Sequence, residues 1–393
     1  MQRPRLPIPP PLRMSEPGSF AYHTLTQRWP AIAQQVITDN DFPPEIVEAL
    51  EALMEELPDG KVRSLQDQNA PDAAAWRDYL QPFLGQSWLE MPWYFAESYF
   101  YRRILEATRY FLPGAGQGVD PFANKKRAGL ATALDRLQAT SNQVNQIHHA
   151  NLDSLIYRGL WGNQADLSLQ PRRTYSNTET NADYILVDDT SLVLDRIANL
   201  QDSRIDFISD NAGSELLCDL YLVDFLLSSN AVSTFHLHLK PHPTFVSDAT
   251  LADLHHTLEV LATDTDSNLN SWAQRLESYI SSGQLQLRED FFWTAPLVFW
   301  EMPPSLRQDI SEASLVFLKG DANYRRLLGD RHWQSTTAFE DIVCYFPAPF
   351  VVLRTLKSEV AAGLKQDQLD WVTQEDPQWL TDGQWGMIQF AQP

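Results

Sequence analysis

From residue 184 onward, short apolar runs of strand type alternate with longer segments whose apolar residues have helical spacing. The candidate strands are Tyr184–Val187, Ile205–Ile208, Thr234–Leu239, Leu315–Leu318, Ile342–Tyr345 and Val351–Leu353. The candidate helices are Ser191–Leu200, Glu215–Leu227, Leu251–Leu261, Leu269–Ser281 and Tyr324–Leu328. Strands that alternate with helices build a parallel sheet with helices on both faces. This part of the chain is therefore predicted to be a three-layer α/β domain with a largely parallel sheet.

The first half of the chain has a different pattern, because helical spacing dominates and runs of β-branched residues are scarce. Glu45–Leu57 and Ala96–Phe111 carry apolar residues three and four positions apart, which is typical of amphipathic helices. Residues 1–14 are rich in proline and lack the apolar core of a secretory signal, so we expect a flexible tail. The predicted organisation is this tail, a helical domain at 15–180 and the α/β domain at 181–393.

The chain is strongly acidic, with 51 Asp and Glu against 30 Lys and Arg and a formal net charge of −21. Such a charge repels phosphate backbones, which argues against a nucleic-acid partner. No stretch approaches the roughly 18 uncharged apolar residues of a membrane helix, so no membrane partner is expected. Cys218 and Cys344 lie in apolar segments and are predicted to be buried thiols, which favours a reducing, cytoplasmic setting.

Charged and amide side chains follow several of the candidate strands. In a parallel sheet the carboxyl ends of the strands meet at one edge, where ligands bind. The residues in these positions are Asp188-Asp189, Asp210-Asn211, Asp248, Lys319 to Arg326 and Arg354 to Lys357. Carboxylate and amide oxygens suit a metal ion, and Lys or Arg side chains suit phosphoryl oxygens. The pattern therefore predicts a metal-assisted phosphate site at this edge.

The segment Asp210 to Glu215 is the most informative part of this edge. It leads from a strand into a helix, so hard oxygen ligands stand beside N–H groups at the positive end of the helix dipole. Glu215 and Asp219 are one helical turn apart and both can face the Asp-Asn corner, whereas Asp224 points elsewhere. The alternative is an ordinary capped helix, because Ser, Asp and Asn are common caps.

A second metal pattern lies in the candidate strand Thr234–Leu239. His236 and His238 would point to the same side of this strand, and His242 follows closely. A zinc site is one interpretation, but no Cys or further well-placed His completes a ligand set. We therefore favour packing roles for these histidines.

Six segments stand in order along the chain: Pro92 to Arg102 (PWYFAESYFYR), Leu160 to Ser168 (LWGNQADLS), Asp210 to Glu215 (DNAGSE), Phe245 to Asp248 (FVSD), Lys319 to Arg325 (KGDANYR) and Arg354 to Lys357 (RTLK). Together they resemble the motifs of the damage-control phosphatases, the family once called domain of unknown function 89. The last two resemble the sugar-phosphate phosphatase branch, which is also described as protein-glutamate carboxyl methyltransferases. Ala322 departs from the pattern, where a larger apolar residue is expected, and this affects packing more than chemistry.

The resemblance implies a helical domain followed by a Rossmann-like α/β domain, with a divalent cation held by Asp210, Asn211 and Asp248. Three oxygen ligands of this kind suit Mn²⁺, Co²⁺, Ni²⁺ or Mg²⁺. The side chains expected to bind the substrate are Asp321, Asn323, Tyr324, Arg325, Arg354 and Lys357. Glu97, Arg102 and Asn163 match family motifs in the helical half, where inter-domain ion pairing and substrate contact explain them equally well.

The predicted function is hydrolysis of small phosphorylated metabolites, such as fructose 1-phosphate or fructose 6-phosphate. The metal would activate a water molecule, and attack by Asp210 through an aspartyl-phosphate is the alternative. Glu215 or Asp219 would position the nucleophile, while Lys357 and Arg325 would neutralise the transferring group. Two other functions stay open. One is an S-adenosylmethionine-dependent carboxyl methyltransferase. A glycine-rich loop after the first strand would hold the ribose of that cofactor, but none follows Tyr184–Val187. The other is a non-catalytic binding scaffold.

Overall fold

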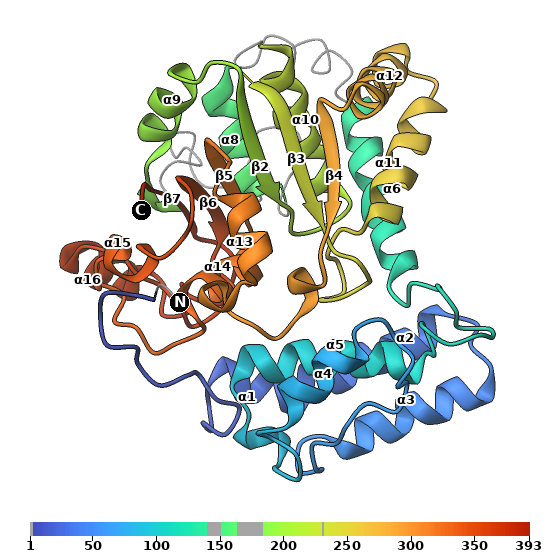
Figure 1. The fold of residues 1–393 in the computed structure, drawn as a ribbon. Coiled ribbons are helices and arrows are strands. Elements are labelled where there is room, and N and C mark those ends of the chain that lie inside the picture. The colour runs from blue at the N-terminus through green and yellow to red at the C-terminus, as the bar shows by residue number, and fades with distance from the viewer. Residues whose placement is uncertain (1–2, 140–150, 163–183, 230–231) are drawn as a thin grey trace.

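The computed structural model describes residues 3–139, 151–162, 184–229 and 232–393, which form a helical layer next to an α/β unit (Figure 1). Within these ranges the α/β unit contains a seven-stranded sheet in the order β1-β7-β6-β5-β2-β3-β4. The strands are β1 (Ile185–Asp188), β2 (Ser203–Ile208), β3 (Val232–Leu239), β4 (Leu285–Glu289), β5 (Leu315–Lys319), β6 (Phe350–Thr355) and β7 (Gly386–Ala391). β2 to β6 are parallel, while β7 is antiparallel to β6 and parallel to β1. The predicted α/β class with a largely parallel sheet is confirmed.

Helices cover both faces of this sheet. The helical layer contains α1 (Phe20–His23), the π-helical turn η1 (Thr24–Arg28), α2 (Trp29–Asp39), α3 (Pro44–Glu56), α4 (Ala73–Leu80) and α5 (Trp93–Ala107). The later helices are α6 (Ala123–Ala139), α8 (Leu152–Trp161), α9 (Thr190–Ala198), α10 (Ser214–Ser228), α11 (Leu251–Ala262), α12 (Ser267–Ser282), α13 (Pro304–Ile310), α14 (Asp321–Leu328), α15 (Phe339–Val343) and α16 (Gln366–Glu375). Among the helices of the described ranges, none has the length and apolar character that a membrane span requires.

The sequence of β5 explains how the sheet is buried on both faces. Leu315 and Phe317 lie in one hydrophobic core together with residues of α8 and α10. Val316 and Leu318 lie in a second core together with Tyr324 of α14. Because alternate residues of a strand point to opposite faces, a strand that is apolar throughout fits only a covered, central position.

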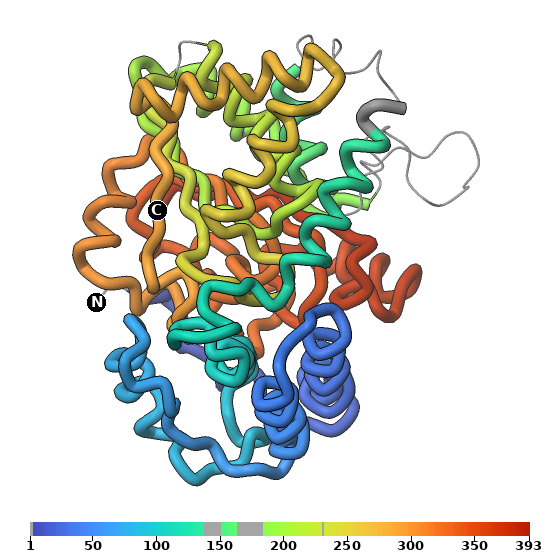
Figure 2. Tube along the Cα trace, turned by 90° about the vertical axis from the view of Figure 1, so that its right-hand side faces the viewer, coloured from blue at the N-terminus to red at the C-terminus, as the bar shows by residue number. Residues whose placement is uncertain are grey.

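Helices from the first half of the chain lie in two different places. α2 to α5 form the layer near the carboxyl ends of β2 and β3 (Figures 1 and 2). In contrast, α6 and α8 pack with α10 on the sheet, through Leu130, Leu134, Ile156 and Leu160. The first half therefore supplies both a wall beside the strand ends and part of the α/β core.

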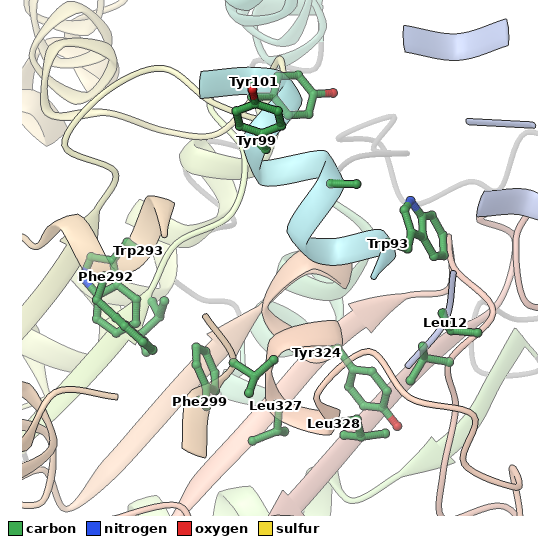
Figure 3. Close-up of a cluster of buried hydrophobic side chains, with 14 of the residues drawn as sticks. Leu12, Trp93, Tyr99, Tyr101, Phe292, Trp293, Phe299, Tyr324, Leu327 and Leu328 are labelled. Carbon is green, nitrogen blue, oxygen red and sulfur yellow. The ribbon is translucent and has the colours of Figure 1, made fainter. Parts of the chain in front are cut away.

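One buried cluster joins the helical layer to the α/β unit (Figure 3). Trp93 and Tyr99 of α5 belong to the same continuous core as Tyr324 and Leu328 of α14. Burial of large aromatic side chains across this boundary holds the two parts together.

Residues 3–14 are not the flexible tail that their proline content predicts. They form a strap, in which the Leu12 N–H donates to the Asp330 carbonyl at 3.0 Å and the Trp93 N–H donates to the Leu12 carbonyl at 2.9 Å. Leu12 and Met14 are buried. Proline fixes the extended backbone in advance, so this segment loses little chain entropy when its apolar residues dock.

Three further expectations about the α/β unit are wrong. Ile342–Tyr345 contains the end of helix α15 rather than a strand, and Cys344 is partly exposed. Four apolar residues in a row fit a buried helix turn as well as a strand. The sequence pattern did not predict strands β4 and β7, because β4 is rich in polar residues and β7 begins with glycine.

The position expected for Asp188-Asp189 is also wrong. β1 runs antiparallel to β2, so these two residues lie at the opposite edge of the sheet from Asp210.

Candidate active site

The turn after β2 and the loop 244–250 are cross-linked by backbone hydrogen bonds. The Ala249 N–H donates to the Asp210 carbonyl at 2.8 Å, and the Ala212 N–H donates to the Ser247 carbonyl at 2.7 Å. Asn211 and Asp248 face each other as an isolated antiparallel bridge. Backbone pairing of two distant segments thus brings together Asp210, Asn211 and Asp248, the three predicted metal ligands.

The loop that carries Asp248 has a strained backbone. Phe245 and Val246 have φ angles of 46° and 66°, a region that non-glycine residues rarely adopt. The Phe245 ring lies 5.9 Å from the ring of Tyr94 and 5.0 Å from that of Tyr101, both in α5. Aromatic packing from the helical layer therefore holds this loop in its unfavourable conformation.

Close approach of the β5–α14 turn also fixes the position of Asp210. Gly320 has φ 89° and ψ 172°, and a Cβ atom there would lie 1.9 Å from Asp210 Oδ2. No other residue type fits this position, because the backbone region is nearly exclusive to glycine and the carboxylate fills the space. The turn then leads directly to Asp321 at the start of α14.

Buried negative charge gathers at this corner. Burial raises the pKa of Asp210 well above its usual range, and the nearby charges of Glu215 and Asp248 raise it further. Burial also raises the pKa of Asp248, against the opposing effect of Lys240, whose Nζ lies 3.2 Å from Asp248 Oδ2. Two carboxylates and an amide oxygen in one buried corner are the donor set of a hard divalent cation, which would relieve their mutual repulsion.

Glu215 lies behind these three side chains and contacts one of them. Its carboxylate accepts from Asn211 Nδ2 at 2.7 Å and from Lys319 Nζ at 2.8 Å. Burial opposes the charge of Glu215, but Lys319 and Lys357 outweigh it and lower its pKa. Asp219 lies 3.4 Å from Lys319 Nζ, and burial raises its pKa to about 7. Of the two carboxylates that were expected to face the corner, Glu215 contacts Asn211, whereas the partner of Asp219 is Lys319 behind it. Asp224 pairs with Arg275 elsewhere.

A pocket of about 760 Å³ opens between this corner and the helical layer. Side chains of the predicted site that line it are Asp210, Asn211, Asp248, Asp321, Arg325 and Lys357. Its other wall consists of residues from α2, α5 and the segment around α6, including Trp93 and Tyr101. The pocket therefore combines the strand ends with the N-terminal helices.

Three residues expected to bind substrate do not line this pocket. Asn323 is buried and its Nδ2 donates to the carbonyl of Lys319 at 2.8 Å. The Tyr324 hydroxyl accepts from the Ala362 N–H at 3.2 Å. Arg354 is also buried, stacks on the Tyr324 ring and donates to Asp321 Oδ1 at 2.8 Å. These three buried side chains therefore support the β5–α14 turn and Asp321 on the side away from the pocket.

The guanidinium of Arg325 lines the pocket but is already surrounded by partners. Its Nε donates to Asp330 at 2.8 Å, its Nη1 donates to Glu97, and it lies 3.8 Å above the Trp93 ring. Glu97 therefore makes an ion pair between the two parts of the protein. Arg102 instead pairs with carboxylates of the helical layer, and Asn163 lies outside the described residues.

In the described ranges, one group of His and Asp donors has metal-like spacing outside this pocket. Donor atoms of Asp206, His236 and His238 lie within 4.8 Å of one another. However, Arg204 already donates to both Asp206 oxygens, at 2.7 and 2.8 Å, and His238 Nε2 lies 3.0 Å from Oδ2. Burial lowers the pKa of His236 to about 4, so its ring is neutral. An ion here would have to displace an arginine, which favours a packed polar network.

Several pocket residues carry no signal in the sequence. Arg28, Gln35 and Lys125 belong to none of the six motifs, yet all three line the pocket. Two lysines outside the pocket lining also contribute. The fold shows that Lys319 forms an ion pair with Glu215 and that Lys240 forms one with Asp248.

Comparison with known proteins gives consistent matches over almost the whole chain. A family model described as the damage-control phosphatase ARMT1-like domain matches residues 24–371. The damage-control phosphatase ARMT1 of Danio rerio is 34% identical over 96% of this chain and 95% of its own length. The Homo sapiens and Mus musculus proteins of the same name are 30% and 31% identical, over 98% and 97% of this chain and 99% and 98% of their own lengths. A crystal structure of a DUF89 family protein from Pyrococcus horikoshii aligns with a TM-score of 0.49 and 12% identity, over 86% of this chain and 91% of that one.

Proposed function

The chain belongs to the ARMT1-like family of damage-control phosphatases, and we propose that it hydrolyses phosphate monoesters of small metabolites in the pocket at the strand ends. One observation supports this location above the others. Asp210, Asn211 and Asp248 meet through backbone pairing in the same pocket that Lys357 and Asp321 line.

We propose that Asp210, Asn211 and Asp248 hold a divalent cation, Mn²⁺, Co²⁺, Ni²⁺ or Mg²⁺, since their oxygens and buried charge fit such an ion. When bound, this cation polarises the phosphoryl group and lowers the pKa of a coordinated water. Glu215 has the role of a positioning residue, because it accepts from the Asn211 amide and so turns the amide oxygen of Asn211 away from itself.

Lys357 is the proposed electrostatic partner of the phosphoryl oxygens. It lines the pocket, and within the described residues no carboxylate oxygen lies within 4.0 Å of its ammonium group. Its backbone N–H donates to Asp321 Oδ1 at 3.3 Å, the same atom that Arg354 and Ser358 contact. This set of contacts fixes where Lys357 enters the pocket. Sugar phosphates such as fructose 1-phosphate and fructose 6-phosphate are the proposed substrates.

Phosphate release from p-nitrophenyl phosphate and from both fructose phosphates tests this proposal, with chelated enzyme and after addition of Mn²⁺ or Co²⁺. We expect activity only with metal, and a loss of about 100- to 1000-fold in kcat for Lys357→Met, which keeps the stem and removes the charge. Lys365→Met is the matched control, because Lys365 is exposed and outside the pocket. Full activity after exhaustive chelation, or methyl transfer from S-adenosylmethionine without phosphate release, would contradict the proposal.

A further inference from the structure

One side of helix α5 lines the pocket across from the metal corner. Trp93, Glu97 and Tyr101 all belong to the pocket wall. They stand four positions apart, and this spacing places side chains above one another on one side of a helix. The three positions span a rise of about 12 Å. Helix α5, on which Figure 3 shows Trp93 and Tyr101, therefore presents a continuous strip of side chains to a molecule in the pocket.

Tyr101 brings a hydroxyl group into this strip. The residue is 5% exposed, and its ring packs against Phe245 and Phe122, with ring centroids 5.0 and 6.0 Å away. Within the described residues the hydroxyl has no hydrogen-bond partner, although its oxygen is not fully enclosed. Because a buried tyrosine hydroxyl ordinarily finds a partner in the protein, this one is placed to bind a molecule in the pocket.

The hydroxyl of Tyr101 stays protonated in this position. Burial raises the pKa of Tyr101 well above its usual range, and the nearby charge of Glu97 raises it further. The group is therefore a neutral phenol, which both donates and accepts hydrogen bonds. Tyr99 on the same helix shows the contrast, because its hydroxyl donates to the Arg63 carbonyl at 2.7 Å.

Glu97 presents an acceptor one helical turn away from this hydroxyl. Its Oε2 atom binds Nη1 of Arg325. In the part of the chain that the structure describes, its Oε1 atom has no hydrogen-bond partner and is not fully enclosed. A carboxylate oxygen accepts hydrogen bonds from hydroxyl groups and repels phosphoryl oxygens. Glu97 therefore has one oxygen for the ion pair and one for the pocket.

The two sides of the pocket differ in charge. Lys357 and the proposed cation belong to the α/β side, where they serve the reacting phosphoryl group. On α5 the pocket presents a neutral phenol and a carboxylate instead, and carboxylates outnumber basic side chains on the pocket wall as a whole. The α5 side therefore fits an uncharged group that carries hydroxyls better than it fits a second anion.

We propose that the Tyr101 hydroxyl and Glu97 Oε1 bind hydroxyl groups of the sugar, at the end of the substrate that does not react. The inference rests on the proposed function for the reacting end. It makes Tyr101 and Glu97 the residues that select sugar phosphates over phosphate esters of apolar alcohols. A site that hydrogen-bonds a substrate hydroxyl discriminates strongly against an analogue without it, because the polar groups of the site are then left unpaired.

Matched substrates test this assignment. Fructose 6-phosphate and n-hexyl phosphate are six-carbon monoesters with and without hydroxyl groups. For wild type, kcat/KM is expected to be at least tenfold higher for fructose 6-phosphate. Tyr101→Phe removes the hydroxyl alone, so it should lower kcat/KM about tenfold for fructose 6-phosphate and leave n-hexyl phosphate within about twofold. Equal losses with both substrates, or no loss with either, would overturn the assignment.

A variant of Glu97 tests the second contact. Glu97→Met also breaks the ion pair with Arg325, so activity should fall with both substrates. If Oε1 binds a sugar hydroxyl, kcat/KM should fall about tenfold further for fructose 6-phosphate than for n-hexyl phosphate. A fall of the same size with both would assign Glu97 to the ion pair alone and overturn its part of the proposal.

Tyr99→Phe is the matched control, because it makes the same change on the same helix outside the pocket. It should keep the preference between the two substrates and lower the free energy of unfolding, since the Arg63 carbonyl loses its donor. Tyr101→Phe should lower the preference without lowering stability. A loss of stability in Tyr101→Phe with an unchanged preference would mean that the hydroxyl has a structural role, against the proposal.

A binding measurement separates this inference from the phosphatase assignment. Chelated enzyme, which does not turn over, is titrated calorimetrically with both monoesters. A loss of affinity in Tyr101→Phe that is limited to fructose 6-phosphate, and absent in Tyr99→Phe, supports the inference even if no phosphate is released. Unchanged affinity of Tyr101→Phe for fructose 6-phosphate would overturn the inference, even where the metal-dependent phosphatase assay succeeds.

Discussion

Asp210 is buried beside two other carboxylates, and this crowding has a cost in stability that a bound cation would remove. Asp248 and Glu215 both raise the pKa of Asp210, so the three negative charges oppose one another in the absence of metal. Only Glu215 has a direct partner strong enough to offset burial, in Lys319. Function and stability therefore make opposite demands on Asp210.

Replacing Asp210 by Asn should stabilise the chelated protein and abolish metal binding. Loss of one buried charge is expected to raise the free energy of unfolding by on the order of 1 kcal/mol in the presence of a chelator. Wild type should instead gain about 2.7 kcal/mol at a Mn²⁺ concentration a hundredfold above its Kd, and Asp210→Asn should gain far less. Chemical unfolding with and without Mn²⁺ measures both effects. Equal stabilisation of the two proteins by Mn²⁺ would place the ion elsewhere.

A substitution at Gly320 tests whether the close contact between the β5–α14 turn and the Asp210 carboxylate fixes the position of Asp210. In Gly320→Ala the new Cβ would meet Asp210 Oδ2 at 1.9 Å, so the turn or the carboxylate must move. We expect a loss of stability above the roughly 1–3 kcal/mol of a strained backbone, together with loss of phosphatase activity. Gly283→Ala is the control, since Gly283 has φ 79° with nothing within 4 Å of the added atom. Comparable losses in both variants would show that backbone strain alone is responsible.

At the scale of elements, the contact between α5 and α14 connects the helical layer to the strand ends. Arg325 of α14 binds Glu97 of α5 and stacks on Trp93, while the Tyr94 N–H donates to Asp330 just after α14 at 2.8 Å. The same helix α5 supplies the aromatic rings that pack on Phe245. The position of α5 is thus coupled to both sides of the proposed metal corner.

A double-mutant cycle measures this coupling. Arg325→Lys keeps the charge but loses the fork that contacts Asp330 and Glu97 together, and Glu97→Gln removes the opposing charge. We expect each change to lower the free energy of unfolding, with a coupling energy of about 1–3 kcal/mol. Because the guanidinium is already bound, Arg325→Lys should reduce kcat rather than raise KM alone. A pure KM effect with unchanged stability would instead support direct phosphate binding by Arg325.

At the scale of the whole molecule, the helical layer, the strap and the α/β unit share one hydrophobic core. Leu12 of the strap, Trp93 of α5 and Val316 of β5 all belong to it. Hydrogen bonds from the strap to α5 and to Asp330 add polar contacts at the same boundary. We therefore expect the described parts of the chain to unfold in a single cooperative transition.

Deletion of residues 1–14 should destabilise the protein, in contrast to what a flexible tail would do. Burial of a Leu or Met side chain contributes about 1.5–3 kcal/mol, and both Leu12 and Met14 are buried. The shortened chain should therefore lose several kcal/mol of unfolding free energy, measured by chemical denaturation. Deletion of residues 1–4 is the control, since it leaves both buried side chains in place. Unchanged stability after removal of residues 1–14 would mean that the strap contributes nothing.

Local patterns in the sequence were sufficient for the class of fold, and they also named the three side chains of the proposed metal corner. Short apolar runs such as Leu315–Leu318, in alternation with longer segments of helical spacing such as Leu269–Ser281, predicted the α/β class that the structure shows. The family motifs likewise named Asp210, Asn211 and Asp248, and the fold brings these three side chains together.

Tertiary structure alone decided which side chains reach the pocket. Arg354 and Arg325 look alike in sequence as candidate phosphate ligands, yet Arg354 is buried behind Asp321 and Arg325 is held by Glu97 and Asp330. Likewise, Arg28 and Lys125 belong to no motif, although both line the pocket. The physical reason is that a sequence pattern records the period and chemistry of neighbours along the chain. Ion pairing and burial depend on residues hundreds of positions apart, such as Glu97 and Arg325, which only the folded chain brings into contact.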